Sequence, residues 1–517
     1  MRAPLAELEG RRFDIAVIGA GANGASAAQH LAGAGYSVLL VDKGDYCSGS
    51  SSRSSRLLHC GLRYLAPGGS LWDFALHPSR LKTALTMARE AMLCRRQLVQ
   101  TAPERVLPLT FHFPIWRDGV YRAWQVDLAL RILASLAPRD VPLDHRRLSP
   151  AEARRTPLVN ALRDMDKLDG VAAFREYQFE WPERICMDAV LDAERLGATV
   201  RNYTAATRLA REGDAWRIGL SDAIDGSATA EVTAAVVLNM AGIWIDRVNR
   251  TAGESAGRKI TGTKGVHIMV QLPPECAGNG VATLNRLQEG LYCIPWRGMH
   301  YFGPTETLYE GDPDDIHPTE EEIRWLVGEA NHLLPALNLK RSDVIFAWAG
   351  VRPLTYDPAL PKGKRSRDVH DLSREGLPNV FALTAGPIMT HRSAGAAMVE
   401  AVRGKIAPNG PEQPVSYAAR RFPEDQNSPP LLHDYTAIKL SDLRHAAEHE
   451  DVTNLVDLLF RRVGAGWTET MAADASRQAA DTVAGILGWD EGRVAAEVAA
   501  YRDHLRQQHA LRDGGGR

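Results

Sequence analysis

The sequence predicts an α/β fold in which a Rossmann-type domain is combined with a discontinuous, β-rich second domain and a C-terminal helical domain. The apolar run 13–18 (FDIAVI) leads directly into the glycine-rich stretch 19–24 (GAGANG), which opens a helical segment ending near Gly33. Strand-like and helical segments then alternate up to about residue 405, and the pattern becomes almost wholly helical over 440–505. This alternation is typical of an α/β chain with an added helical unit.

The glycine-rich stretch has the spacing of a phosphate-binding turn. Gly19 permits a tight strand-to-helix turn, Gly21 lets backbone approach a pyrophosphate, and Gly24 allows the helix to pack closely on the strand. The helix N-terminus adds N–H donors. Asp42 stands eighteen residues beyond Gly24, at the end of a second strand, where a carboxylate binds ribose hydroxyls. We therefore expect a dinucleotide other than NADP; the alternative is a glycine-rich turn in an ordinary βαβ unit.

Periodicity and turn residues predict the remaining elements. They are a serine-rich loop (44–55), helices over 80–100, 188–196 and 318–334, a strand at 199–203, an antiparallel insert of 216–220 and 230–234, a buried strand over 236–242 and a linker over 421–430. The strand 379–384, the turn at Gly386 and the helix 393–402 repeat the order found near the N-terminus. A second helix N-terminus directed at the same ligand predicts a large cofactor.

Composition argues against several classes of function. The formal net charge is -2, from 61 basic and 63 acidic residues, so we expect no nucleic-acid partner. The six cysteines lack CxxC or metal-finger spacing, which indicates free thiols in a reducing compartment and no metal site. The first residues do not have the pattern of a secretory signal, and no apolar run is long enough to span a bilayer. We therefore expect a cytoplasmic protein.

One apolar segment, 111–133, is compatible with contact at a membrane surface. It contains Trp116 and Trp124 among the basic residues Arg117 and Arg131, a composition typical of segments that lie on a bilayer. Core packing is the alternative explanation. Membrane contact would place the protein at the periphery of the cytoplasmic face of the inner membrane.

Several motifs resemble those of one family, the FAD-dependent glycerol-3-phosphate dehydrogenases of the aerobic type. The motifs occur in family order and are 50–65 (SSSRSSRLLHCGLRYL), 239–244 (NMAGIW), 264–267 (KGVH), 294–296 (IPW), 350–354 (GVRPL), 366–368 (SRD), 444–450 (RHAAEHE) and 459–462 (LFRR). The likeness runs from Phe13 to about His504.

The resemblance implies a glutathione-reductase-like FAD-binding domain. It divides the chain into an oxidoreductase core over 1–425 and a helical cap over 426–517. Within the core, the FAD-binding segments are 12–75, 180–265 and 345–405. The substrate domain is formed by 76–179 and 266–344. FAD is expected to be bound without a covalent link. The implied reaction oxidises a small phosphorylated polyol, sn-glycerol 3-phosphate in the family, by hydride transfer to flavin N5, and passes the electrons to a quinone or another acceptor. A homodimer is also expected.

The family motifs and the glycine turns together give the expected cofactor-binding residues. These are Gly19, Gly21, Asn23, Gly24, Asp42, Lys43, Ser50, Ser51, Ser52, Arg53, Ser54, Leu58, His59, Ala241, Gly242, Trp244, Gly386, Pro387, Ile388 and Met389. The serines and Arg53 are expected to donate hydrogen bonds to the pyrophosphate and the flavin ring, and the alternative for the serines is a solvated loop. The backbone around Gly386 is expected to approach the flavin pyrimidine edge.

The substrate phosphate requires permanently charged donors. Arginine supplies bidentate donors of this kind, and we expect a clamp of Arg63, Arg352 and Arg367 with the Tyr64 hydroxyl. Arg352 is also expected to act in catalysis. His267 is the first candidate for the base that accepts the alcohol proton, and His59 is the second. Either histidine could instead be structural.

The chain departs from the family pattern around the expected substrate pocket. Cys60 replaces a glycine, and Pro387 replaces a lysine within 385–392 (AGPIMTHR), which removes a cation from the site. His391 replaces a tyrosine and is expected to bind substrate and to restore a positive charge. These changes leave the substrate open, and a related polyol phosphate would use the same clamp.

Two other classes of function remain as alternatives. One is an amine or 2-hydroxy-acid oxidase of the same fold, whose substrate carboxylate would occupy the arginine clamp. The other is a non-catalytic flavin-binding protein, in which Pro387 and Cys60 have abolished turnover.

Overall fold

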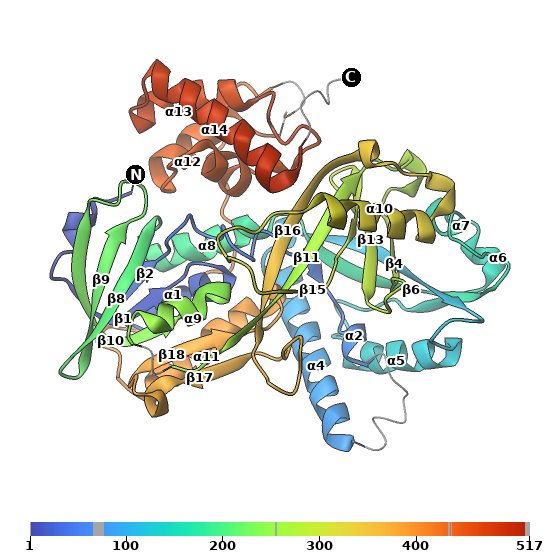
Figure 1. Cartoon of the computed structure of the whole chain (residues 1–517), viewed down its shortest axis with the longest axis horizontal. Helices are drawn as coiled ribbons and strands as arrows, with labels where there is room; N and C mark the ends of the chain where they lie inside the picture. Colours follow the sequence, from blue (N-terminus) through green and yellow to red (C-terminus); the bar gives the residue numbers. More distant parts are fainter. Residues whose placement is uncertain (1, 66–76, 254–255, 433–434, 436, 512–517) are drawn as a thin grey trace.

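A computed structural model describes residues 2–65, 77–253, 256–432, 435 and 437–511, without the side chain of Arg63. Within this part of the chain, an eight-stranded sheet and a ten-stranded sheet stand side by side, and a group of C-terminal helices lies against them (Figure 1). The predicted α/β class, with a Rossmann-type domain, a β-rich second part and a helical C-terminal part, is confirmed.

The first sheet has the strand order β17-β18-β10-β1-β2-β7. Its strands are β1 (Arg12–Ile18), β2 (Val38–Val41), β7 (Thr199–Arg201), β10 (Thr229–Asn239), β17 (Asp368–Asp371) and β18 (Val380–Thr384), with β8 (Thr204–Glu212) and β9 (Ala215–Asp222) added as an antiparallel extension. The predicted antiparallel pair of 216–220 and 230–234 is formed by β9 and the first half of β10. The predicted strand over 236–242 continues the same β10, and β8 was not predicted. The five strands β18, β10, β1, β2 and β7 are parallel. Their carboxyl ends therefore share one edge, where a ligand of such a sheet binds.

Three helices cover a face of this sheet. They are α1 (Ala22–Gly33), α8 (Pro182–Arg195) and α11 (His391–Arg403), and α1 packs between the other two. The alanines and Leu31 of α1 are buried against Ile15 and Val17 of β1 and Leu238 of β10. Small residues on α1 allow the close helix-on-strand packing that the sequence predicts.

The second sheet has the order β15-β11-β14-β13-β12-β4-β6-β3, with β16 paired to β11 and β5 to β6. Its strands are β3 (Leu57–Leu58), β4 (Val106–Trp116), β5 (Arg146–Leu148), β6 (Leu168–Phe179), β11 (Ile260–Val270), β12 (Asn279–Leu284), β13 (Gly290–Trp296), β14 (Met299–Gly303), β15 (Thr307–Tyr309) and β16 (Val344–Thr355). The helices around it are α2 (Leu62–Leu65), α4 (Pro78–Thr101), α5 (Ala123–Leu136), α6 (Pro150–Ala153), α7 (Pro157–Asn160) and α10 (Glu320–Leu333). The strands β3 and β16 belong to this sheet, although most of their residues fall in segments that the resemblance assigns to the FAD-binding part of the core. The limits between the FAD-binding part and the substrate domain therefore stay a prediction.

Helices dominate the C-terminal part. They are α12 (Leu440–His449), the π-helix η10 (Asp457–Arg462), η11 (Ala465–Trp467), α13 (Ser476–Leu487) and α14 (Glu491–His509). Shorter helices elsewhere are η1 (Leu5–Leu8), η2 (Pro103–Arg105), η3 (Gly242–Trp244), α9 (Ile245–Arg250), η4 (Pro274–Cys276), η5 (Pro335–Leu337), η6 (Arg341–Asp343), η7 (Leu372–Glu375) and η8 (Ile388–Thr390). The C-terminal helices contact a helix that covers the first sheet and a strand of the second sheet: η10 packs on α8, and α14 packs on β16.

Candidate functional site

The turn between β1 and α1 fits closely against the end of β10. The backbone of Gly19 has φ +105°, and a Cβ there would lie 2.7 Å from the carbonyl oxygen of Met240. A Cβ on Gly24 would lie 1.8 Å from the carbonyl oxygen of Gly19. Glycine is therefore required at both positions. The contact also brings the second predicted glycine turn, with Ala241 and Gly242, next to the first.

The residues around this turn fit a dinucleotide. The residue that caps the N-terminus of α1 is Gly21, which has no side chain to accept from the first N–H groups of the helix. Asn23 is half-buried in the first turn. Gly242 has φ +56°, and no atom of the described residues lies within 4 Å of the point that a Cβ would occupy there, so this turn leaves open space. Open space beside a helix N-terminus suits a pyrophosphate.

Asp42 is held where a ribose would be bound. Its carboxylate accepts hydrogen bonds from the Ala20 N–H at 2.7 Å and from the Gly44 N–H at 2.9 Å. Burial raises the pKa of Asp42 to about 6, so at neutral pH the carboxylate is ionised in most molecules. An ionised carboxylate still has lone pairs for two hydroxyl groups.

The loop that follows β15 contacts the side chains of Lys43 and Trp244. The Lys43 ammonium lies 4.6 Å from the centre of a Trp244 ring, and both side chains contact Asp314, with Trp244 Nε1 donating at 2.8 Å. Arg53 Nη1 donates to the carbonyl oxygen of Ile316 in the same loop at 2.9 Å. Asp314 was not predicted from the sequence, because it lies in a polar loop without a motif.

The serine-rich loop is ordered largely by its own hydroxyl groups. Ser50 Oγ donates to the Val351 carbonyl at 2.6 Å, and Ser52 Oγ donates to the Gly49 carbonyl at 3.0 Å. Ser54 Oγ accepts from the Arg56 N–H at 3.1 Å. Ser51 Oγ accepts from the Ala22 N–H at 2.9 Å, so its own proton stays available to a phosphate. The structure thus favours Ser51 over Ser50 and Ser52 as a donor to the cofactor.

The turn after β18 brings further predicted residues together. Gly386 has φ +82°, and the preceding Ala385 N–H donates to the Pro353 carbonyl at 2.8 Å. Beyond Pro387, Ile388 and the buried Met389 pack with Leu58. The turn after β18 therefore lies against β3, the strand that follows the serine-rich loop.

A cavity opens beside this turn. It is lined by Tyr64, Met87, Glu90, Ala91, Arg365, Ser366, Arg367, Gly386, Pro387 and Thr390. Tyr64 and Arg367, two members of the predicted phosphate clamp, thus share one cavity with the turn expected at the flavin. Arg63 belongs to the same clamp, but its side chain lies outside the described part of the structure.

Both arginines of the cavity contact carboxylates. Arg367 Nη2 donates to Glu90 Oε1 at 3.0 Å, and its Nη1 donates to Ser393 Oγ at 2.7 Å. Arg365 forms an ion pair with Glu306. Glu90 was not predicted from the sequence, because a single glutamate on the polar face of a long helix gives no signal of its own.

The two other predicted reactive groups lie on neighbouring strands of the second sheet. His267 of β11 is buried, its Nε2 is 3.0 Å from Ser55 Oγ, and its ring stacks on Trp348 with centres 4.7 Å apart. Arg352 of β16 lies over Gly265, where a Cβ would be 2.9 Å from Nη2. Burial and the Arg352 charge hold the pKa of His267 well below its usual value. The imidazole is therefore neutral, the form that accepts a proton.

His59 lies nearer to the cavity. Its ring meets the ring of Tyr64 edge-on, with centres 5.5 Å apart, and Tyr64 lines the cavity. Neither His267 nor Arg352 is among the residues lining it. The predicted site therefore divides into a group around Tyr64 and Arg367 and a group around His267 and Arg352.

One expectation about the departures from the family pattern is wrong. His391 is buried, its Nδ1 is 2.9 Å from the Ile388 carbonyl oxygen, and burial together with Arg392 lowers its pKa to about 3. It therefore carries no positive charge at neutral pH and does not replace the missing lysine. Cys60, which stands where the resembled family has glycine, is fully buried in the hydrophobic core.

The segment 111–133 is partly exposed. Trp116 is buried, whereas Trp124 on α5 is 60% exposed, with Val120 and Leu128 also exposed nearby. Core packing thus accounts for the first tryptophan and not for the second. Among the described residues, no helix combines the length and the apolar character needed to cross a membrane.

Comparison with known proteins places these features in a family context. Residues 14–401 match the sequence model of a family described as FAD dependent oxidoreductase. The chain is 33% identical over 426 residues to a Synechocystis protein named glycerol-3-phosphate dehydrogenase, covering 79% of this chain and 73% of the relative. It is 31% identical over 389 residues to a Brucella abortus protein named D-erythritol 1-phosphate dehydrogenase, covering 73% of this chain and 71% of the relative.

A solved structure shares the fold over almost the whole chain. It is that of the glycerol-3-phosphate dehydrogenase from Bacillus halodurans complexed with FAD, with a TM-score of 0.71, 20% sequence identity, and coverage of 98% of this chain and 96% of that chain.

Proposed function

The chain belongs to the FAD-dependent oxidoreductases and, among them, to the glycerol-3-phosphate dehydrogenase family, and from this premise we propose that it oxidises a phosphorylated polyol to the matching keto phosphate. The proposed substrate is sn-glycerol 3-phosphate, which gives dihydroxyacetone phosphate, or a slightly longer polyol phosphate such as the one in the name of the Brucella relative. FAD is the cofactor, and when bound it supplies the hydride acceptor at flavin N5.

The observation that carries the proposal is the cavity between α4 and the turn after β18. Its wall contains the guanidinium groups of Arg365 and Arg367 and the hydroxyl-bearing Tyr64, which are donors of the kind that bind a phosphate. The same cavity is lined by Gly386 and Pro387, the turn proposed to contact the flavin. A polyol phosphate bound there would place its carbon chain beside the cofactor.

We assign the remaining residues as follows. Gly19 and Gly24 permit the tight turn and the close packing of α1, Gly21 and Gly242 leave room for the pyrophosphate, Asp42 binds the ribose hydroxyls, and Ser51 donates to a phosphate. FAD is held without a covalent link. Arg352 stabilises negative charge that develops on the alcohol oxygen, and a neutral imidazole takes the proton. His267 remains the first candidate for this base, and His59, beside Tyr64, is the alternative.

The proposed electron acceptor is a quinone, reached at a membrane surface. The support is the exposed apolar side of α5 with Trp124 and Leu128. Arg131 lies in the same helix, and Arg117 precedes the helix in the sequence. An exposed tryptophan with flanking arginines suits the interfacial zone of a bilayer. We propose that the protein acts at the cytoplasmic face of the inner membrane, as a homodimer.

Anaerobic reduction of the purified flavoprotein tests the proposal. Glycerol 3-phosphate and erythritol 1-phosphate are added separately, and the absorbance of oxidised flavin is followed. Bleaching by either compound, with none by glycerol or erythritol, supports oxidation of a polyol phosphate. If neither phosphate bleaches a flavin that dithionite still reduces, the proposed substrate class is wrong.

One observation supports a second candidate, an amine oxidase acting on an amino acid. Arg367 and Glu90 place a cation and a carboxylate side by side in the cavity, which are the complements of a substrate carboxylate and its ammonium group. Bleaching by glycine or proline, and not by the polyol phosphates, would favour this second function.

A further inference from the structure

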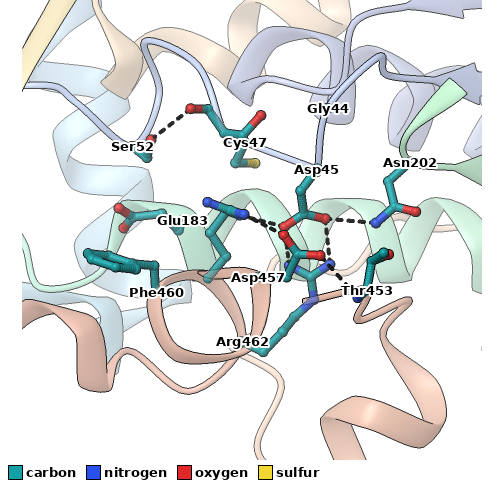
Figure 2. Close-up of polar contacts among 12 residues, drawn as sticks. Gly44, Asp45, Cys47, Ser52, Glu183, Asn202, Thr453, Asp457, Phe460 and Arg462 are labelled. Carbon is teal, nitrogen blue, oxygen red and sulfur yellow. Dashed lines mark hydrogen bonds and ion pairs between the residues drawn. The ribbon is translucent and has the colours of Figure 1, made fainter. Parts of the chain in front are cut away.

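A buried acid, Asp45, connects the cofactor-binding loop to the C-terminal helices. Arg462 donates two hydrogen bonds to it, from Nη1 to Oδ2 at 2.8 Å and from Nη2 to Oδ1 at 2.7 Å (Figure 2). Arg461 also donates to Oδ2, and Asn202 Nδ2 donates to Oδ1 at 2.8 Å. Asp45 and Arg462 are fully buried. Bidentate contacts of this kind fix both position and orientation.

The loop that carries Asp45 also carries the residues proposed to bind FAD. Asp42 lies three positions before Asp45 and accepts the N–H of Gly44 at 2.9 Å. On the other side, the Cys47 N–H donates to the Ala20 carbonyl in the glycine turn at 3.0 Å. Ser51 follows and bonds the first turn of α1. The position of Asp45 therefore determines how Asp42 and Ser51 face the dinucleotide site.

The two arginines come from the π-helix η10. Asp457 begins that helix and accepts from the Thr453 N–H at 3.0 Å (Figure 2). It also accepts from Arg461 Nη2 and from the Tyr203 hydroxyl at 2.7 Å. Two buried guanidinium groups thus face two buried carboxylates, Asp45 and Asp457. Burial alone would raise the pKa of Asp45, but Arg462 and Arg461 hold it below its usual value. The carboxylate is therefore ionised and bound to the helical domain.

We propose that the C-terminal helical domain positions the cofactor loop, with Arg461 and Arg462 holding Asp45 so that Asp42 and Ser51 bind FAD. The two arginines touch neither substrate nor cofactor, and they are positioning residues that act through the loop. The inference rests on the FAD dependence of the family and on the site proposed above. It does not depend on which substrate is oxidised, because its readout is retention of FAD.

The test compares two buried ion pairs that both join the helical domain to the rest of the chain. Arg462→Lys keeps the charge but loses the bidentate contact with Asp45. Glu450→Gln breaks the pair between Glu450 and Arg184 of α8, in which Nη1 and Nη2 lie 2.5 and 2.8 Å from the carboxylate oxygens. This second pair is as deeply buried but does not contact the loop over 42–55. It is the control, and it shares one contact with the tested residue: Arg462 Nε donates to the Glu450 backbone carbonyl at 2.7 Å, which Glu450→Gln leaves in place.

Release of FAD from the holoprotein is measured by the rise in flavin fluorescence after dilution, together with the thermal unfolding midpoint. Damage to a buried ion pair lowers the free energy of unfolding, because a buried charge loses its partner. Both variants should therefore unfold at lower temperature. We expect Arg462→Lys to release FAD about tenfold faster than the wild type, and Glu450→Gln to release it at about the wild-type rate.

Equal release from the two variants would overturn the proposal, since a purely structural role of the domain would affect both alike. Release at the wild-type rate from Arg462→Lys would also overturn it. If Arg462→Lys does not fold, Asn202→Ala removes the hydrogen bond from the Asn202 amide to the ionised Asp45 carboxylate, together with the bond from the same amide to the Asp451 carbonyl oxygen at 2.9 Å. We then expect about tenfold faster release, since a hydrogen bond to a charged group contributes about 1.5 kcal/mol and about 1.4 kcal/mol is tenfold in a rate. An unchanged rate would contradict the proposal.

Discussion

The guanidinium group of Arg367 donates to the carboxylate of Glu90 at 3.0 Å on the wall of the cavity that we propose for the substrate. The two residues are 277 positions apart in the sequence and come from the loop before β17 and from α4. A carboxylate at this position offsets one of the positive charges that would bind a phosphate. Glu90 therefore sets how strongly the cavity attracts a dianion.

The first prediction is that Glu90→Gln strengthens binding of the polyol phosphate. Loss of the carboxylate removes a repulsion and releases Arg367 to the substrate. We expect KM to fall roughly threefold, within the ~1 kcal/mol that a partly exposed charge pair contributes, and kcat to stay unchanged. Steady-state kinetics with the substrate identified by flavin bleaching measures this.

Glu104→Gln is the matched control for this change. Glu104 also pairs with an arginine, Arg421, and is 37% exposed, compared with 38% for Glu90, but it does not line the cavity. Its KM should equal that of the wild type. A rise in KM for Glu90→Gln would show that the carboxylate instead binds a hydroxyl or ammonium group of the substrate.

A second prediction concerns Pro387, which stands where the resembled family has lysine. Its backbone has φ −71° and ψ 147°, a conformation open to any residue, so Pro387→Lys introduces no strain. The new ammonium group would enter the cavity wall. We expect KM for the polyol phosphate to fall roughly threefold to fivefold, as for one added charge near a phosphate, with a stronger dependence on salt.

Pro387→Ala separates the effect of charge from the loss of the ring. It should leave KM and its salt dependence near the wild-type values. If the alanine and lysine variants change KM equally, the cause is the shape of the turn and not the added charge.

The third prediction tests His267 as the base. We expect His267→Gln to lower kcat/KM by about 10²–10⁴-fold, the contribution of general base catalysis, while FAD stays bound. Because burial and Arg352 hold the pKa of His267 well below its usual value, kcat/KM of the wild type should show no loss between pH 8 and pH 6.5 from protonation of this histidine.

His300→Gln is the control for loss of a buried histidine. His300 lies on β14 of the same sheet, is buried like His267, and contacts the Cys276 carbonyl oxygen at 3.3 Å. Its activity should stay near that of the wild type. If His59→Gln loses the activity and His267→Gln keeps it, the base is His59 and His267 is structural.

The parts of the site that local sequence determines were predictable. Gly19 and Gly24 have a fixed spacing and follow a strand, and both are required by steric contacts around the first βαβ unit. Asp42 ends the next strand, so its position at the same sheet edge follows from the parallel pairing of β1 and β2. The helices α4, α10 and α11 and the strands β9 and β18 were predictable for the same reason, since each depends on periodicity within a short segment. The strands β4, β6 and β8 were not predicted.

Long-range partners were not predictable. Glu90 with Arg367, and Asp45 with Arg462, are pairs of ordinary charged residues from distant segments, and no local pattern indicates which carboxylate meets which arginine. The error about His391 has a related origin. A histidine in the sequence gives no measure of its burial, and burial is what decides whether it carries a charge.

The fourth prediction follows from that burial. The pKa of His391 is lowered to about 3 in the folded protein by burial and by Arg392, and in the unfolded chain it returns to about 6.5. Between these values the unfolded chain binds one proton more than the folded protein does, so stability is present above about pH 6.5 and is lost as the pH falls. Each pH unit below 6.5 costs about 1.4 kcal/mol from this residue.

His391→Gln removes the titrating group and should therefore remove this part of the acid sensitivity. Urea unfolding of the holoprotein at pH 7, 6 and 5 measures it. The variant is expected to be less stable than the wild type at pH 7, because the contact with the Ile388 carbonyl is disturbed, and the difference should shrink by about 1.4 kcal/mol per pH unit below 6.5. A difference that stays constant over this range would mean that His391 has the same pKa in the folded and unfolded chains. That result would restore the cation that the sequence led us to expect beside Pro387.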